Sequence, residues 1–169
     1  VRPPTWLYVP APKLPELLAK AAASADAVVI DLEDAVHPDH RPAARRLLQE
    51  CLTELDVPVD VRINAVGSPD FYLDLEALDH ALATRATRHA IVVTDLVFSM
   101  DGDVVPVADI AAVCAAHDAL LVLDEAHAAL GPHGAAAVAR ASGCEVVTVG
   151  TLSKTLGSLG GFVAGSRDV

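Results

Sequence analysis

Short apolar segments alternate along the chain with longer Ala- and Leu-rich segments of helical length. The apolar segments are rich in β-branched residues and predict strands, whereas the longer segments predict helices. The predicted strands are 6–9, 27–31, 59–63, 90–94, 120–123, 145–149 and 161–164, and the predicted helices lie near 13–24, 41–53, 73–88, 107–117 and 134–142. This alternation is typical of an α/β fold with an open, mainly parallel sheet and flanking helices.

Three of the predicted strands are apolar without a polar alternation. Their sequences are AVVID, AIVVTD and ALLVLD. Continuous apolar strands are typical of parallel sheets that are covered by helices on both faces. We therefore expect these three strands to be buried on both faces.

Polar clusters follow five of the predicted strands. They are IDLED (30–34), VRINAVGS (61–68), VTDLVFSMDGD (93–103), LDEAH (123–127) and TLSK (151–154). Ligands bind at the carboxyl ends of strands in parallel α/β sheets, so these clusters are candidate functional residues. The alternative is that their Asp and Ser side chains cap the helices that follow.

Composition and charge exclude several classes of protein. Of 169 residues, 53% are hydrophobic and the net charge is −11, which argues against intrinsic disorder and against nucleic-acid binding. No apolar stretch approaches the roughly 18 residues of a membrane span, and the first residues lack the apolar region of a signal peptide. Cys51, Cys114 and Cys144 show no metal-ligand spacing, so we expect buried thiols, no metal site and a cytoplasmic protein.

Lys154 is the first candidate for chemistry, in the segment GTLSKTLGSLGG. A lysine at a buried strand end is poorly hydrated, which makes its amine a nucleophile able to form a Schiff base with a carbonyl. Thr151 and Ser153 flank it with hydroxyls that could bind a phosphate. The alternative is an ordinary surface lysine.

Asp124 and His127 form a second candidate pair in LVLDEAH. A pyridine ring that acts as an electron sink needs a carboxylate beside its nitrogen and donors near its phenolic oxygen. Asp124 could supply the first, and His127 and Ser99 the second. The letters DEAH also suggest a helicase box, but the chain has no P-loop to accompany it.

Three ordered motifs between residues 78 and 169 carry a family resemblance. VVTDLVFSMDGD (92–103), LLVLDEAHAALGPHG (120–134) and VVTVGTLSKTLGSLGGFVAGS (146–166) resemble the α-oxoamine synthase family of fold-type I pyridoxal-phosphate enzymes. That family includes 8-amino-7-oxononanoate synthase and glycine C-acetyltransferase. The resemblance implies a pyridoxal 5'-phosphate cofactor and a decarboxylative condensation of an acyl-CoA with a small amino acid. It also implies a homodimer as one assembly.

The resemblance also implies roles for single residues. Lys154 would be the Schiff-base lysine and afterwards the general base at the amino-acid Cα. His127 would be catalytic with it and would bond the phenolic oxygen. Asp124 would pair with the pyridine nitrogen.

Three further residues would complete the cofactor contacts by the same resemblance. Ser99 would share the phenolic oxygen with the imidazole. Ala126 would pack against one face of the ring, and Thr151 would hold the phosphate. The family's ring-stacking histidine and its substrate-binding arginine have no counterpart in the matched segment.

Residues 2–78 resemble a different family. PTWLYVPAPKLPELLAKAAASADAVVIDLEDAV and VDVRINAVGSPD are similar to the citrate lyase β-subunit-like (HpcH/HpaI aldolase) enzymes, which are TIM barrels acting on CoA thioesters with Mg²⁺. Arg62 would bind a substrate carboxylate or carbonyl, and Asp31, Glu33 and Asp34 would line the mouth of the barrel. The metal ligands of that family are not in the matched segment, and Glu33 and Asp34 could instead be capping charges.

The two resemblances meet at DLEAL (74–78), which fits both families. The chain is therefore predicted to be a chimera or fragment, with one domain over 1–78 and another over 79–169. We expect the two parts to join into one open sheet of six or seven strands. Three functions stay open: the pyridoxal-phosphate acyltransferase, the Mg²⁺-dependent carbon–carbon lyase, and a chimeric fragment without catalytic activity.

Overall fold

The computed structural model describes residues 4–51, 57–85, 89–99, 101–128 and 130–166. The chain divides into two compact units, Val1–Ala86 and Thr87–Val169. The described strands form one sheet in each unit, with three strands in the first and four in the second. The predicted α/β class is confirmed, but the expectation of one joined sheet is wrong. The reason lies in the pairing, since β3 is hydrogen-bonded only to β2 and β4 only to β5.

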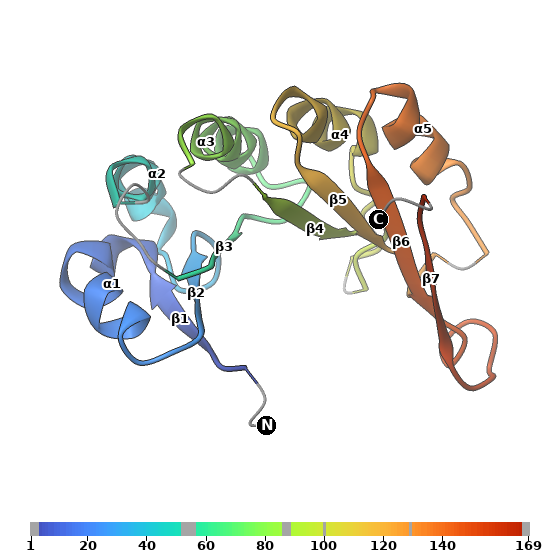
Figure 1. The fold of residues 1–169 in the computed structure, drawn as a ribbon, viewed down its shortest axis with the longest axis horizontal. Helices are drawn as coiled ribbons and strands as arrows, with labels where there is room; N and C mark the ends of the chain where they lie inside the picture. Colours follow the sequence, from blue (N-terminus) through green and yellow to red (C-terminus); the bar gives the residue numbers. More distant parts are fainter. Residues whose placement is uncertain (1–3, 52–56, 86–88, 100, 129, 167–169) are drawn as a thin grey trace. The chain divides into compact units, whose positions relative to one another are not determined.

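The N-terminal unit is a βαβαβα segment with an all-parallel sheet in the order β1-β2-β3 (Figure 1). Its main elements are β1 (Trp6–Pro10), α1 (Leu14–Ala22), β2 (Ala27–Asp31), α2 (Arg41–Cys51), β3 (Val59–Arg62) and α3 (Phe71–Thr84). Short 3-10 turns at Ala11–Lys13 and Pro38–His40 precede α1 and α2. The sheet is open, as three strands cannot close an eight-stranded barrel.

The core of this unit surrounds β2, whose five residues are all buried as the apolar pattern predicts. Helix α1 contributes Leu14, Leu18 and Ala21, which recur at helical spacing and face the sheet. Leu48 of α2 is fully buried in the same cluster. The apolar faces of the helices and the continuous apolar strand therefore pack into the same core.

A buried ion-pair network ties α3 to α2 and to the end of β3. Asp74 is fully buried, and one of its oxygens accepts a hydrogen bond from Arg45 Nε at 2.6 Å. Its other oxygen accepts from the backbone N and the Nδ2 of Asn64, at 2.8 and 2.7 Å. Asp70 accepts further bonds from Arg41 and Arg45. The start of α3 is thus held by a network of buried and part-buried charges, in which Asp74 accepts hydrogen bonds on both of its oxygens.

The C-terminal unit has a sheet in the order β4-β5-β6-β7. Its elements are β4 (Ile91–Asp95), α4 (Val107–Ala116), β5 (Leu120–Asp124), α5 (Ala135–Ala141), β6 (Val146–Thr151) and β7 (Gly161–Ala164). Strands β4, β5 and β6 are parallel, and β7 returns antiparallel to β6. All seven strands and all five helices of the pattern are therefore found within a few residues of their predicted bounds.

Helices α4 and α5 lie on the same side of this sheet (Figure 1). On that face Leu121, Leu123 and Val146 are buried. The opposite face presents Ile91 and Val93, which are 62% and 67% exposed. The expectation that β4 is buried on both faces is wrong, because the described helices of this unit cover one face only and β4 is an edge strand. β5 is likewise buried on alternate residues only.

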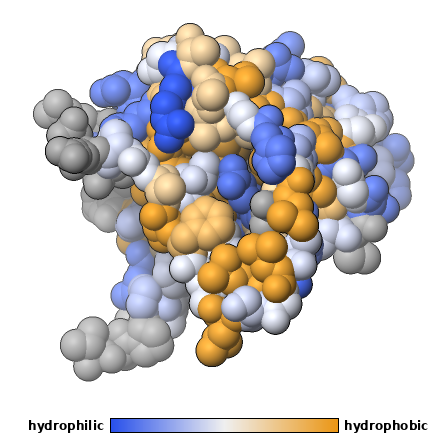
Figure 2. All heavy atoms as spheres, turned by 90° about the vertical axis from the view of Figure 1, so that its right-hand side faces the viewer, coloured by the Kyte–Doolittle hydropathy of each residue, from blue (hydrophilic) through white to orange (hydrophobic). Residues whose placement is uncertain are grey.

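Two glycines of the β6–β7 hairpin, Gly150 and Gly161, lie at diagonal positions of the ladder and are closely packed. A Cβ on Gly150 would lie 2.5 Å from the ring of Phe162, its partner in the ladder. A Cβ on Gly161 would lie 2.8 Å from the backbone oxygen of Gly150. Apolar side chains gather on this side of the unit, where Leu159, Phe162 and Val163 are exposed (Figure 2). In the described parts of the chain, no helix has the length and apolar character that crossing a membrane requires.

Candidate functional site

The carboxyl ends of β4, β5 and β6 lie side by side in the C-terminal sheet. Asp95, the last residue of β4, is the register partner of Asp124, the last residue of β5. Because register partners in neighbouring strands point to the same face, the two carboxyl groups share one face of the sheet. β6 ends at Thr151, two residues beyond the partner of Asp124. The polar residues that follow these strands are therefore brought to one edge.

Lys154 and His127 meet at this edge. His127 lies in the turn after β5, and its Nε2 is 2.7 Å from the Nζ of Lys154, in the turn after β6. A lysine ammonium can only donate, so a charged Lys154 donates this bond to a neutral imidazole. Both side chains are exposed, so the burial of Lys154 agrees with the alternative of a surface lysine and not with a lysine at a buried strand end. The reason is that Lys154 lies three residues beyond β6, in a turn that projects from the sheet.

Asp124 is held in position by the backbone of the turn after β5. One of its oxygens accepts a hydrogen bond from the backbone N of Ala126 at 2.7 Å, as an Asx turn does. Asp124 and Ala126 are both half-buried. Among the described contacts, no hydrogen bond reaches the second oxygen of Asp124, which could therefore bind a ligand. The packing of Ala126 against a ring stays a prediction.

Thr151 and Ser153 form a small hydroxyl cluster beside Lys154. Thr151 Oγ1 lies 2.7 Å from Ser153 Oγ and 3.2 Å from the backbone oxygen of Gly160, to which it donates. It also accepts a bond from the backbone N of Ser153. Two hydroxyls and one backbone N–H thus gather at the start of the turn. These donors are already engaged with one another and with Gly160, so an anionic group would have to displace these bonds in order to accept from them.

Ser99 stands apart from this group in the described contacts. It is exposed in the turn that follows β4, which is closed by a bond from the N of Gly102 to the oxygen of Phe98. No described hydrogen bond joins Ser99 to His127 or Lys154. Its predicted bond to a phenolic oxygen stays a prediction.

Asp95 is a member of this group that lies in the predicted polar cluster 93–103 but was given no role of its own from the sequence. Burial and the neighbouring charge of Asp124 raise the pKa of its carboxyl, while the charges of His127 and Lys154 oppose that shift. The sequence feature that could have indicated Asp95 is the similarity of VVTD to LVLD, since both are apolar strands that end in aspartate. In a sequence alone, such an aspartate is not distinguished from an ordinary turn residue.

The strand ends of the N-terminal unit bring Arg62 together with three carboxylates. Its Nε and Nη2 donate to the two oxygens of Asp31 at 3.0 and 2.6 Å. Its Nη1 lies 3.0 Å from Asp34 and 3.7 Å from Glu33. The guanidinium carbon also lies 5.4 Å from the ring centre of Tyr8. Each nitrogen of the predicted substrate-binding arginine therefore already faces a carboxylate.

The electrostatics of this cluster are those of a closed ion pair. Burial alone would raise the pKa of Asp31, but hydrogen bonds from Arg62 and from the backbone amides of Glu33 and Ala35 outweigh it and lower the pKa. Burial and the charge of Asp34 raise the pKa of Glu33. Within the described residues, no group of three or more His, Cys, Asp or Glu side chains is arranged to hold a metal ion. A substrate carboxylate would compete here with three carboxylates already present.

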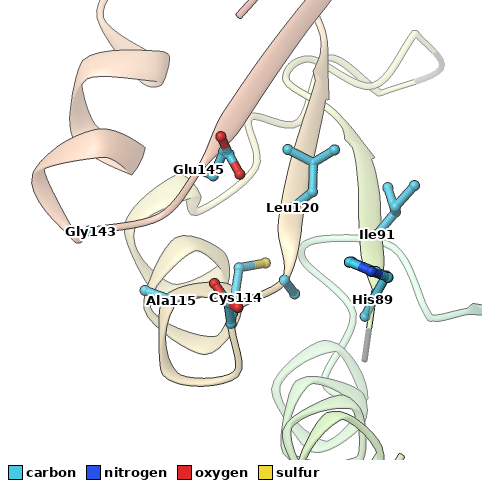
Figure 3. A pocket seen from close by; sticks show the side chains of 10 residues that line it. His89, Ile91, Cys114, Ala115, Leu120, Gly143 and Glu145 are labelled. Carbon is cyan, nitrogen blue, oxygen red and sulfur yellow. The ribbon is translucent and has the colours of Figure 1, made fainter. Parts of the chain in front are cut away.

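A shallow pocket lies at the opposite edge of the C-terminal sheet (Figure 3). It has a volume of about 390 Å³ and is lined by residues at the amino ends of β4, β5 and β6, among them His89, Leu120 and Glu145. None of the predicted site residues lines it. Burial raises the pKa of the lining thiol Cys114 to about 12, which makes it an inert thiol. Cys114 and Cys144 are buried, as expected from their interpretation as small hydrophobic residues, whereas Cys51, near the end of α2, is only half-buried, so the expectation is wrong for this thiol.

Comparison with known sequences assigns the chain to a family. The sequence model of the aminotransferase class I and II family matches residues 54–169, and the chain belongs to this family. The model of the HpcH/HpaI aldolase/citrate lyase family matches residues 5–85. The two matches overlap over 54–85, the range that contains β3 and α3. The chain thus joins sequences that resemble two families.

Individual relatives carry the name 8-amino-7-oxononanoate synthase. The protein of that name from Marinobacter nauticus is 50% identical over 98 residues, which are 55% of this chain and 25% of the relative. The one from Mycolicibacterium smegmatis is 46% identical over 114 residues, or 64% of this chain and 29% of the relative. The chain therefore spans only about a quarter of the length of these relatives.

Solved structures of serine palmitoyltransferase are also similar. The enzyme from Sphingomonas wittichii is 26% identical, with a TM-score of 0.51 over 84% of this chain and 32% of its own. A variant from S. paucimobilis with a bound PLP–myriocin aldimine gives 26% identity and a TM-score of 0.52, covering 82% of this chain and 33% of its own. These likenesses agree with the family assignment and with the α/β architecture.

Proposed function

We propose that the C-terminal unit carries the lysine side of a pyridoxal-phosphate site of the α-oxoamine synthase type. The observation that carries the proposal is the 2.7 Å approach of Lys154 Nζ to His127 Nε2, beside the strand end that presents Asp124. The names of the relatives support it, since they are 8-amino-7-oxononanoate synthases and serine palmitoyltransferases.

The donor set fits the chemical groups of pyridoxal phosphate. An amine for the aldehyde, an imidazole for the phenolic oxygen and a carboxylate for the pyridine nitrogen lie on neighbouring strand ends, in Lys154, His127 and Asp124. The hydroxyls of Thr151 and Ser153 could bind a phosphate by exchanging the hydrogen bonds that they now make with each other and with Gly160. When bound, the cofactor supplies an electron sink for the carbanion that forms at an amino-acid Cα.

The chain's own residues would prepare the amine and orient the ring. His127 lies where it can accept a proton from the Lys154 ammonium, which frees the amine as a nucleophile. The bond from the N of Ala126 fixes Asp124 in one orientation. Because Lys154 and His127 are exposed, the described residues do not themselves exclude water from the pair.

The finer parts of the function rest on the relatives alone. An acyl-CoA and a small amino acid are the proposed substrates, condensed with release of CO₂ and CoA. A homodimer is the proposed assembly. The Mg²⁺-dependent lyase receives no support from the geometry, because Arg62 is already paired with Asp31.

Covalent trapping of the cofactor tests the proposal directly. The full chain is mixed with pyridoxal phosphate, its visible spectrum is recorded, and the adduct is reduced with borohydride and located by peptide mass. We expect one adduct, on the peptide that contains Lys154, and none in Lys154→Ala. Lys13 and Lys20 serve as internal controls, since both are exposed lysines of the N-terminal unit. Labelling spread evenly over the three lysines would contradict the proposal.

A further inference from the structure

The sheet of the N-terminal unit has an open edge at β1. Among the described strands, β1 pairs with β2 alone, so backbone groups along its outer edge are bonded to no described strand. Trp6, Leu7 and Tyr8 of this strand are 52%, 43% and 58% exposed. Edge strands of soluble proteins commonly carry a charge or an internal proline that blocks further pairing. β1 has no charged residue, and its proline, Pro10, is its last residue, so the edge is open to a further strand.

A groove lies beside this edge, between β1 and α1. It has a volume of about 280 Å³, with Leu7 of β1 on one side and Leu17, Lys20 and Ala21 of α1 on the other. The three helix residues are spaced three and four positions apart, so they share one face of α1. The groove is thus largely apolar and can take an apolar side chain.

Lys20 is the charged residue of this groove. No acidic residue lines the groove, and in the described parts of the chain the Lys20 amine has neither a hydrogen bond nor an ion pair. Lys13, just before α1, is by contrast paired with Glu16 at 3.3 Å. In a chain with a net charge of −11, an unpaired ammonium beside an apolar groove favours a ligand that carries a carboxylate.

We propose that the groove between β1 and α1 binds an extended segment of a partner protein, which adds to the edge of β1 as a further strand. The backbone of the segment bonds the open edge, and one of its apolar side chains enters the groove between Leu7 and Leu17. A carboxylate two positions away lies on the same face of the segment and pairs with Lys20. A compact ligand would fill the groove but leave the backbone of β1 unbonded, which is why a peptide is favoured. This interaction belongs to the N-terminal unit and does not depend on the function proposed for Lys154.

A short peptide tests the proposal on the full chain. The probe is the capped, fluorescein-labelled peptide Thr-Val-Thr-Leu-Thr-Glu-Thr, in which leucine and glutamate share a face. Fluorescence anisotropy gives its Kd, and we expect hydrogen exchange in β1 to slow when it binds. N-methylation of one set of alternate amides should weaken binding about tenfold or more, whereas N-methylation of the other set should change it little. The reason is that only one edge of the peptide faces β1.

Charge reversal tests the role of Lys20. Lys20→Glu should weaken binding of the probe about threefold to tenfold and should favour the peptide with lysine in place of glutamate. Lys13→Glu is the matched control, because it makes the same change in net charge outside the groove and should leave the Kd unchanged. Hydrogen exchange of β2 checks that both variants are folded. The N-methylated peptides need no variant, so they test the proposal even if Lys20→Glu does not fold.

Four results would overturn the proposal. The first is no binding of the probe, and the second is an equal Kd for the two N-methylated peptides or an equal effect of the two lysine variants. The third is binding of dodecanoate in preference to the probe, which would show that the groove takes a small amphiphilic anion. The fourth is a dimer in sedimentation velocity that protects β1 without any peptide, which would show that a second copy of the chain occupies the edge.

Discussion

Both units place an aspartate at the carboxyl end of a central strand, Asp31 in β2 and Asp124 in β5. Asp31 is 1% exposed, and both of its oxygens accept hydrogen bonds from Arg62, which comes from the neighbouring strand β3. Asp124 is half-buried, and the described hydrogen bond to its side chain comes from the backbone N of Ala126 in its own turn. The same position in the fold therefore carries a closed ion pair in one unit and an open carboxylate in the other.

The difference lies in what the neighbouring strand supplies. β3 ends in an arginine, whose planar guanidinium can satisfy a carboxylate on both oxygens. β4 ends instead in a second carboxylate, Asp95, and the cation Lys154 reaches the edge from an exposed turn and contacts His127. Charged side chains that form ion pairs with one another stabilise the fold. Charged side chains that lack such partners can instead bind a ligand. The comparison predicts that substitutions in the first cluster change stability and those in the second change reactivity.

The largest effect is expected at Asp74, the centre of the buried network of the N-terminal unit. Asp74→Ala leaves Arg45 and Asn64 without a partner that they bond at 2.6 to 2.8 Å, which should cost about 3 to 5 kcal/mol of unfolding free energy. Urea unfolding followed by fluorescence of Trp6, the one tryptophan of the chain, measures it within this unit. Glu76→Ala, exposed on the same helix, is the control and should cost about 0.5 kcal/mol or less. Equal losses in the two variants would contradict a structural role of the network.

The pair of Asp31 with Arg62 should show a pH-dependent contribution. The pKa of Asp31 is lowered in the folded unit, so its stabilisation is present above its ordinary value of 3.8 and is lost as the pH falls below it. At pH 7, Asp31→Asn should cost about 2 kcal/mol, because its partner is partly exposed. The same fluorescence-detected unfolding should show the gap between the two proteins narrowing in acid.

Asp34→Asn is the matched control for this pair, because the Asp34 side chain is 76% exposed. Its loss should be about 0.5 kcal/mol or less at any pH. A gap for Asp31→Asn that stays constant from pH 7 to pH 3 would show that the ion pair is not its cause.

Within the C-terminal unit, stability should depend on backbone packing of the hairpin rather than on charge. Gly161→Ala forces a Cβ against the backbone oxygen of Gly150, which cannot move aside, and should cost about 2 kcal/mol. Gly150→Ala meets only the ring of Phe162, which is 37% exposed and can rotate away, so the loss should be smaller. Hydrogen exchange of β6 and β7 measures both variants. The reverse order would show that the Phe162 ring, and not the backbone approach, requires glycine here.

The smallest effect on stability is expected at Lys154. Lys154→Met removes an exposed cation whose contact is an exposed imidazole, so the unfolding free energy should change by about 0.5 kcal/mol or less. Hydrogen exchange of β5 and β6 gives the value for this unit, and the adduct with pyridoxal phosphate should be lost in the same variant. A loss of stability as large as that of Asp31→Asn would place Lys154 with the structural ion pairs.

Much of the fold could be predicted from sequence, and the reason is local. Runs such as AVVID and LLVLD predict strands because β-branched and apolar residues favour a pleated, buried segment, and all seven strands were found. The burial of β4 was predicted wrongly, because exposure depends on which helices cover a strand and not on the strand itself. Ile91 has the same apolar character as the buried Ile30, yet it is 62% exposed.

The candidate site was also predictable only in part: its residues could be identified from local motifs, whereas the contacts between distant segments could not. Asp124, His127 and Lys154 were predicted as candidate residues from the motifs LDEAH and TLSK. These motifs follow predicted strands, and the residues that follow parallel strands lie together at the carboxyl edge of the sheet. The contact of Lys154 with His127 spans 27 residues, and that of Arg62 with Asp31 spans 31 residues, so no local pattern shows either distance. Asp95 was given no role from the sequence for this reason, since its place beside Asp124 comes from the pairing of β4 with β5.

By itself the sequence of this chain determined the order of strands and helices, the two family resemblances and the residue types available for chemistry. These follow from local periodicity and from motifs within short segments. Only the tertiary structure decided that the strands form two sheets, that Arg62 is neutralised by Asp31, and that Lys154 is exposed beside His127. The physical reason is that pairing, burial and charge interaction depend on distances between segments far apart in the chain.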